Sequence, residues 1–121
     1  MGDERPHYRL TAWQRSMDLV KLVYSWSNAF PSDEKFGLCA QMRRAAVSIP
    51  SNIAEGAARE GSREFAHFLS IARGSLSELE TQYVLSSELG FAERSAEIED
   101  TIDHVSRLIT GLHKRHKQKD K

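Results

Sequence analysis

Residues 43–56 read RRAAVSIPSNIAEG, an apolar pattern of helical period that contains a proline. A proline inside a helix costs about 3 kcal/mol, because it removes one backbone hydrogen bond and crowds the preceding turn. The core face of this helix carries one apolar residue on each turn: Leu38, Met42, Ala45, Ile49 and Ile53. The pattern predicts a helix over residues 33–59 with Ser32 or Asp33 as its N-cap. A kink is expected at Pro50, with Ser or Asn side chains or water bonding the carbonyl that the proline leaves free.

Three more helices are predicted from the same spacing, over residues 11–30, 62–89 and 92–116. Heptad-like core positions mark the last two: Phe65, Leu69, Ala72, Leu76, Leu79 and Tyr83, then Ile98, Ile102, Val105, Ile109 and Leu112. Gly61 suits a turn, Ser62 suits the N-cap of the helix that follows it, and Gly90 suits the position just past a helix end. No strand pattern competes. Because the loops are short, residues 1–121 are expected to form one all-α domain, an antiparallel up-down-up-down four-helix bundle.

The helix at residues 11–30 is apolar on two sides. The first stripe contains Trp13, Met17, Val20 and Tyr24, and the second contains Leu19, Val23, Trp26 and Phe30. A helix that is apolar on two sides must be covered on two sides, and a large exposed apolar patch marks an interaction site. We therefore predict that the second stripe, with Val47 and Ala54, forms a subunit interface. Thr11 and Gln14 resemble a capping box at the start of this helix.

Composition describes an ordinary soluble protein with an uneven charge. The chain has 121 residues, of which 40% are apolar and 28% charged, and its net charge is zero. From residue 93 to residue 107 there are two basic and five acidic residues, whereas residues 114–121 hold five basic residues and one acidic residue. This basic tail is either a solvated, frayed terminus or an arm that binds RNA, DNA or an acidic partner.

Several classes of function find no support in the residue pattern. Cys39 is the only cysteine, so no disulfide can form within the chain, which fits a reducing cytoplasm. Neither a membrane span nor a signal peptide is recognisable, and we expect a cytoplasmic protein. The histidines are not placed with other metal ligands, and no phosphate loop, nucleophile or acid–base pair is legible. We expect no metal, no cofactor and no enzymatic activity.

The helix at residues 33–59 also has an ordered polar side. Seven residues fall within an arc of about 100° at helical phase: Gln41, Arg44, Ser48, Ser51, Asn52, Glu55 and Arg59. One interpretation is a hydrogen-bonded seam between helices or subunits, formed by Gln41, Ser48, Ser51, Glu55 and Glu80, with Glu80 paired to Arg43 or Arg44. The other is an RNA-binding surface formed by Arg43, Arg44, Asn52 and Arg59, together with Lys114, Arg115, Lys117 and Lys119 of the tail.

Long stretches of the chain match a known pattern. They include residues 13–14, 17–20, 37–38, 41, 43–56, 64–65, 68–82 and 89–90, within a region that runs roughly from residue 8 to residue 112. Together they resemble the bacterial four helix bundle protein family, the 23S rRNA intervening-sequence proteins. Some members of that family are encoded within intervening sequences of the large ribosomal RNA gene.

That family is also similar to the accessory variability determinant proteins of diversity-generating retroelements. Those proteins form barrel-shaped pentamers, bind nucleic acid and contact a reverse transcriptase. The resemblance implies a ring-shaped homopentamer here. Two functions are therefore expected as alternatives: a non-enzymatic oligomeric scaffold that binds RNA or a nucleic-acid enzyme, or a ring for protein–protein interaction with no role in nucleic-acid binding.

Overall fold

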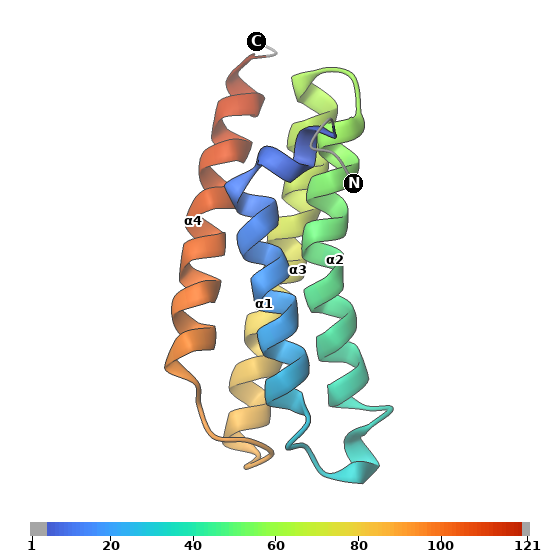
Figure 1. The fold of residues 1–121 in the computed structure, drawn as a ribbon, viewed down its shortest axis with the longest axis vertical. Helices are drawn as coiled ribbons and strands as arrows, with labels where there is room; N and C mark the ends of the chain where they lie inside the picture. The colour runs from blue at the N-terminus through green and yellow to red at the C-terminus, as the bar shows by residue number, and fades with distance from the viewer. Residues whose placement is uncertain (1–4, 120–121) are drawn as a thin grey trace.

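The computed structural model describes residues 5–119, and the side chains of residues 5–118. A short 3-10 helix, η1 (Pro6–Arg9), precedes α1 (Thr11–Ser27), and a second one, η2 (Ser32–Glu34), precedes α2 (Leu38–Ala58). The chain then forms α3 (Ser62–Glu88) and α4 (Ala96–Lys119). Successive long helices run in opposite directions, so that both ends of the chain lie at one end of the molecule together with the α2–α3 turn (Figure 1).

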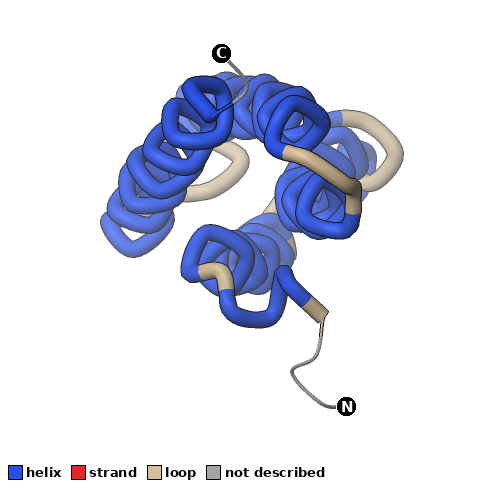
Figure 2. Tube along the Cα trace, turned by 90° about the horizontal axis from the view of Figure 1, so that it is seen from above, coloured by secondary structure: helices blue, strands red, loops and turns tan. Residues whose placement is uncertain are grey.

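The four long helices surround one core (Figure 2). Each helix packs on its neighbours in the sequence, and α4 closes the arrangement by packing on α1. Residues 5–119 contain no strand. The predicted all-α four-helix bundle is therefore confirmed. None of the described helices has the combination of length and apolar composition that a membrane span requires.

The core positions predicted on the last three helices are confirmed at nearly every turn. The fully or largely buried residues include Met42, Ala45, Ile49, Ile53, Leu69, Ala72, Leu76, Leu79, Tyr83, Ile98, Ile102, Val105, Ile109 and Leu112. Leu38 and Phe65 pack against this core at its edge. Apolar residues at heptad-like spacing on three helices form one continuous core when the helices pack antiparallel.

The prediction for α1 is wrong about which stripe faces inward. Leu19 and Val23 have no exposed surface, and Phe30 is buried in the same core. The small residues Ala12 and Ser16 continue this buried stripe toward the start of α1, which lets the neighbouring helices approach closely. The stripe reserved for a subunit interface is thus the core face of α1.

The other stripe of α1 is partly covered by the chain itself. The rings of His7 and Tyr8, from η1, lie 4.9 and 5.3 Å from the ring of Trp13. Farther along, the guanidinium of Arg43 lies 4.6 Å from the ring of Tyr24. The short helix η1 and the side chain of Arg43 therefore cover apolar surface of α1 that would otherwise face water. Helical periodicity in the sequence indicates neither contact.

The α1–α2 connection is longer than predicted. The backbone after Ser27 tightens into i→i+3 hydrogen bonds, ending with Phe30 N to Ser27 O at 3.1 Å, so α1 does not reach residue 30. The start of α2 is bonded by Glu34, whose Oε1 accepts a hydrogen bond from Leu38 N at 3.1 Å. Neither Ser32 nor Asp33 caps α2, because both belong to the 3-10 turn before the helix begins.

The α3–α4 connection confirms one predicted cap and adds another. Gly90 has a φ of 80°, and Phe91 N donates to Ser86 O at 3.0 Å, which is the bonding of a Schellman cap. Ser95 then starts α4, since its Oγ accepts a hydrogen bond from Ile98 N at 3.2 Å. This is why α4 begins at residue 96 rather than residue 92.

Two predicted N-caps occur one residue away from where they were expected. Thr11 and Ser62 are the first residues of α1 and α3, and the N-cap positions are held by Leu10 and Gly61. Gln14 does not close a capping box, because its Nε2 donates to Tyr8 O at 2.7 Å and so ties η1 to α1. Gly61 adopts a φ of 92°, which fits the predicted turn.

Two polar side chains after Pro50 bond to backbone carbonyls of α2. Pro50 is buried inside α2. Ser51 Oγ donates to the carbonyl of Val47 and Asn52 Nδ2 to that of Ser48, each at 2.8 Å. Neither bonds the carbonyl of Ala46, which Pro50 leaves free and which was the expected acceptor.

Helix α2 packs closely on α3 one turn later. A Cβ on Gly56 would lie 2.8 Å from the Cβ of Phe68. The absence of a side chain at Gly56 therefore permits the α2–α3 approach.

Candidate nucleic-acid interface

Charge is separated along the long axis of the bundle. We use "basic end" for the end that holds both chain termini in Figure 1, where the exposed basic residues are Arg5, Arg9, Arg59, Arg63, Arg73, Lys114, Arg115 and Lys117, with Glu55, Glu60 and Glu64 as its exposed acidic residues. The opposite end, the "acidic end", carries exposed Asp33, Glu88, Glu93, Glu97 and Asp100, with Lys35 and Arg94 as its basic residues. A molecule with zero net charge thus presents a positive field at one end.

The predicted basic tail belongs to the last turns of α4. Lys114, Arg115 and Lys117 are exposed on this helix, which continues three residues beyond the predicted end. His116 Nδ1 lies 3.0 Å from Ser62 Oγ, and its ring lies 4.4 Å from that of Phe65. These contacts hold the end of α4 against the start of α3. The side chain of Lys119 and residues 120–121 lie outside the described part of the chain.

His113 is partly buried near two cations of this end. Burial, and then the charges of Arg73 and Lys117, lower the pKa of the His113 imidazole below its ordinary value. The Nη1 atom of Arg73 lies 3.5 Å from His113 Nδ1. Since the neutral imidazole is favoured among these cations, an anion bound nearby would favour the charged form.

A hollow of about 230 Å³ opens between η1, α1 and α4 at the basic end. It is lined by Arg9, Leu10, Thr11, Ala12, Leu108, Leu112 and Arg115. Leu10, as the N-cap of α1, offers no side-chain acceptor, so the first backbone N–H groups of α1 have no side-chain cap. A helix N-terminus together with two guanidinium groups provides donors of the kind that phosphate oxygens accept.

Arg43 makes contacts within the subunit, away from the basic end, and its role as an RNA contact stays a prediction. Its Nε donates to Ser27 Oγ at 2.8 Å, and its Nη2 donates to Tyr24 O at 3.2 Å and to Asn28 Oδ1 at 3.0 Å. With the guanidinium also against the Tyr24 ring, Arg43 fastens the end of α1 to α2. The Nε and Nη2 donors of Arg43 are thus used within the subunit.

The other candidates on α2 divide between the two ends. Arg44 is exposed, but fourteen residues separate it from the end of α2 at residue 58, about 21 Å along the helix. Asn52 is half-buried and bonds Ser48. Arg59 alone lies at the basic end, where it pairs with Glu55 at 2.9 Å and lies 5.1 Å from the ring of Phe68.

The predicted polar seam is mostly an exposed surface. Gln41, Ser51, Glu55 and Glu80 are all exposed. Only Ser48 joins two helices, through a 2.8 Å hydrogen bond between its Oγ and that of Ser75 on α3.

The predicted ion pair of Glu80 with Arg43 is wrong. Glu80 borders a hollow that it shares with residues of α4, whereas Arg43 points to α1. Within residues 5–118, Glu80 makes no ion pair at all, with Arg44 or any other cation.

Of the predicted interface residues, two remain on the surface. Val47 is 40% exposed and Ala54 is half-buried, both on α2. Leu19, Val23 and Phe30 are in the core, as described above. Trp26 is half-buried, and its Nε1 donates to Glu93 O at 2.7 Å, which fixes the α3–α4 connection. These four residues therefore serve the fold of one subunit.

The family model for the 23S rRNA-intervening sequence protein matches residues 8–111. The chain belongs to this family. No curated protein matches it. The match covers α1, α2, α3 and α4 as far as residue 111, so the basic residues from 114 onward lie beyond the matched region.

Sequence reasoning missed four basic residues of the candidate interface: Arg5, Arg9, Arg63 and Arg73. None of them belongs to a run of basic residues in the sequence, and only the antiparallel packing brings them near the tail. The signal that was available is that residues 59 and 63 flank the turn that must lie beside the end of α4 in an up-down-up-down bundle.

No cluster of three or more potential metal ligands occurs in the part of this protein that the structure describes.

Proposed function

We propose that this protein is a non-catalytic, oligomeric four-helix bundle that binds structured RNA through its basic end. The observation that carries the proposal is the convergence of basic side chains from distant parts of the chain at that end. Lys114, Arg115 and Lys117 come from α4, Arg9 from η1, and Arg59 and Arg63 from the α2–α3 turn and the start of α3. The family to which the chain belongs is named for an intervening sequence of 23S rRNA, which makes RNA the first ligand to test.

The electrostatics of the basic end suit a phosphate backbone. Binding a phosphate releases condensed counterions, so each lysine or arginine that contacts one adds to affinity and to salt dependence. The hollow between Arg9 and Arg115 would accept one phosphate group, with both guanidinium groups as donors. Phosphate contacts carry little sequence information, so we expect recognition of RNA shape more than of RNA sequence.

The test is fluorescence anisotropy of a labelled RNA hairpin titrated with protein at several salt concentrations. Three charge reversals, Lys114→Glu, Arg115→Glu and Lys117→Glu, are expected to weaken binding at least tenfold at physiological salt. They should also flatten the plot of log affinity against log salt, by about one unit for each phosphate that the variant no longer binds.

A matched control separates local from total charge. Lys21→Glu, Arg44→Glu and Arg107→Glu make the same change in net charge at exposed positions outside the basic end. This control should bind RNA nearly as well as the wild type. Equal loss of affinity in both triple variants, or no wild-type binding at low salt, would contradict an RNA site at the basic end.

We also propose that the subunits assemble into a closed ring, with five subunits as the resemblance to the accessory variability determinant proteins implies. The support from this chain is its exposed apolar side chains on two helices: Val47 on α2, and Ile71, Leu85 and Leu89 on or just after α3. A cyclic assembly joins two different faces of each subunit, and apolar residues on two helices fit that requirement.

A ring that binds a protein rather than RNA is the second candidate. The acidic end favours it, because its carboxylates would repel a phosphate backbone and attract a basic protein surface. Under this alternative the triple reversal at the basic end would leave the function unchanged, and binding of the RNA hairpin would be absent at physiological salt.

A further inference from the structure

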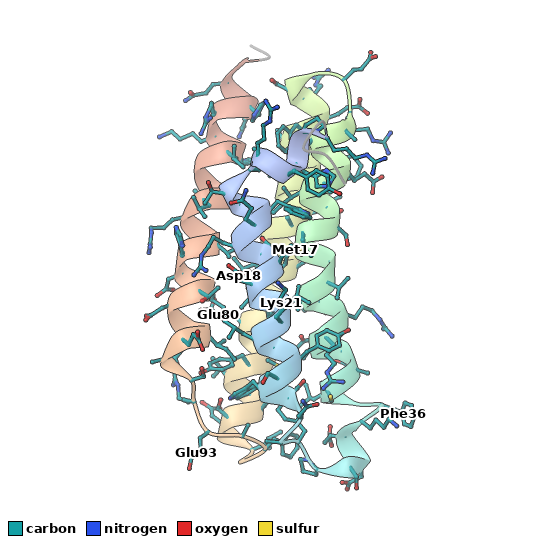
Figure 3. All side chains as sticks on the ribbon, in the orientation of Figure 1. Met17, Asp18, Lys21, Phe36, Glu80 and Glu93 are labelled. Carbon is teal, nitrogen blue, oxygen red and sulfur yellow. The ribbon has the colours of Figure 1, made fainter. Side chains whose placement is uncertain are left out.

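Phe36 is the most exposed large apolar side chain described. It is 87% exposed, in the three-residue connection between η2 and α2. The ammonium of Lys35 lies 5.6 Å from the centre of its ring, so a cation and an aromatic ring project together. Figure 3 shows Phe36 extending outward beyond the start of α2 at the acidic end. Exposed aromatic residues of this kind are typical anchors of protein interfaces.

The backbone around Phe36 is held by hydrogen bonds. Lys35 N donates to Ser32 O at 3.2 Å, and Gly37 N donates to Glu34 O at 3.1 Å. The Glu34 carboxylate also bonds the first turn of α2, at Leu38 N. The ring is therefore presented from a fixed turn, which lowers the entropy lost when it is buried against a partner.

A groove on α3 has the complementary properties. Its volume is about 500 Å³, and its lining consists of Glu80, Thr81, Val84, Leu85 and Glu88. Val84 packs on the core at the base, and Leu85 is 44% exposed beside it. Glu80 and Glu88 are eight residues apart, about 12 Å along the helix, with the apolar residues between them.

We infer that Phe36 of one copy of this chain inserts into the α3 groove of a second copy, with Lys35 bonding the carboxylates of Glu80 or Glu88. Charge complementarity at Lys35 favours a second copy as the occupant, since the groove carries two carboxylates and Lys35 is the charged residue beside the Phe36 ring. Of the two carboxylates that precede Lys35, Glu34 bonds Leu38 N of its own subunit and Asp33 is exposed. Burying the Phe36 ring between Val84 and Leu85 removes apolar surface of both copies from water.

The geometry suits a ring. Phe36 projects beside α2, while Glu80 lies toward α4 in Figure 3, so projection and groove are on different sides of one subunit. The Phe36 projection and the α3 groove both lie in the half of the bundle near the acidic end. Two neighbouring subunits can therefore make this contact when they stand side by side at the same height. A contact between two different faces at one level is heterologous, and repetition closes it into a ring if the rotation permits. This contact rests on the proposed assembly, and it names the residues that make it.

The first test is the mass in solution, by light scattering of the eluting peak in size-exclusion chromatography. Wild type is expected to elute as an oligomer of the 13.7 kDa chain, and Phe36→Ser as the monomer. Because the Phe36 side chain is so exposed within its own subunit, Phe36→Ser should not change the thermal unfolding midpoint of the monomer. Phe36→Tyr retains the ring and should retain the oligomer.

Charge reversal provides the second test. Lys35→Glu should dissociate the oligomer, and so should the double variant Glu80→Lys and Glu88→Lys. Combining all three changes should restore the wild-type mass, because the pairing is then reversed in sign. Lys21→Glu, an exposed reversal on α1, is the control and should leave the mass unchanged.

Cross-linking supplies a positive readout. In a Cys39→Ser background, Phe36→Cys and Leu85→Cys on one chain should form intermolecular disulfides under mild oxidation. They are expected to yield a ladder that ends at the number of subunits in the ring. Each single cysteine variant should give no ladder.

The outcomes separate the contact from the assembly. An oligomeric wild type whose mass survives Phe36→Ser and Lys35→Glu, without cross-links, would overturn the Phe36 contact and leave the ring standing. A monomeric wild type at every concentration would overturn both. Neither result bears on RNA binding at the basic end, which the anisotropy titration measures separately.

Discussion

The hydroxyl of Tyr83 on α3 donates to Oε2 of Glu99 on α4, with 2.7 Å between the two oxygens. The same hydroxyl accepts a hydrogen bond from Ser95 N at 2.7 Å, at the start of α4. Trp26 of α1 covers the Tyr83 ring at 4.8 Å between ring centres. One buried phenol thus joins three helices at the point where the α3–α4 connection enters α4.

Removing that hydroxyl should weaken the fold. Tyr83→Phe keeps the ring but leaves Ser95 N without its acceptor, and we expect a loss of about 1–2 kcal/mol in the free energy of unfolding. Urea denaturation followed by circular dichroism measures it. Tyr24→Phe is the matched control, because the Tyr24 side chain is exposed, and a change as large as that of Tyr83→Phe would contradict the assignment.

Glu99 should give the stability a dependence on acid. Hydrogen bonds from Arg94 and then from Tyr83 lower the pKa of the Glu99 carboxyl below its ordinary value. A carboxyl with a depressed pKa in the folded state stabilises the fold above the pKa of the unfolded chain, and this contribution disappears as pH falls through the folded value. Glu99→Gln should therefore be less stable than wild type at pH 7.

The difference between Glu99→Gln and wild type should shrink as the pH falls below about 4, because the wild-type carboxyl then takes up its proton. Urea titrations at a series of pH values measure both chains. A difference that stays constant from pH 7 to pH 3 would show that the charge of Glu99 contributes nothing to stability.

Two glycines inside helices should respond in opposite directions to alanine. A Cβ at Gly56 would lie 2.8 Å from Phe68 Cβ and 3.3 Å from Phe65 O, so Gly56→Ala must push α2 and α3 apart. We expect a loss of about 1–3 kcal/mol from this overpacking. Gly74 has nothing within 4 Å of such a Cβ, and Gly74→Ala should stabilise the fold by about 0.5–1 kcal/mol. Equal effects at the two positions would exclude close α2–α3 packing at Gly56.

Arg43 should matter for stability and not for RNA. Arg43→Ala removes three hydrogen bonds to α1 and the residues after it, and we expect a loss of about 1–3 kcal/mol. Affinity for the RNA hairpin should stay within twofold of the wild type at a temperature where both are folded. A tenfold loss of affinity in a folded Arg43→Ala chain would restore Arg43 to the RNA-binding surface.

The periodic parts of the chain were predictable, and the reason is visible in the core. On α3 and α4 a single apolar stripe leaves one way to orient each helix, and residues such as Leu69 and Val105 are buried as expected. On α1 two stripes of similar strength compete. Small residues such as Ser16 on one stripe, and the contact of η1 with the other, determine which stripe faces the core. Helical periodicity carries no information about either feature.

The candidate interface was predicted only in its contiguous part. Lys114, Arg115 and Lys117 form a visible run, whereas Arg9 and Arg63 join them through packing between segments far apart in the sequence. Arg43 lies outside the polar arc of α2, and its prediction as an RNA contact rests on its clustering with Arg44 in the sequence. Helical phase could not reveal that three acceptors at the end of α1 lie within reach of its guanidinium.

The opposed charge of the two ends also determines how the protein behaves as a solute. With a pI of about 7.0, neutral buffer leaves no net repulsion between molecules. At about 0.01 M salt the Debye length is about 30 Å, so the positive end of one molecule attracts the negative end of the next. At about 0.15 M salt it falls to about 8 Å, and this attraction is screened. The purified protein should therefore precipitate on dialysis into water and redissolve when salt is added, as globulins do.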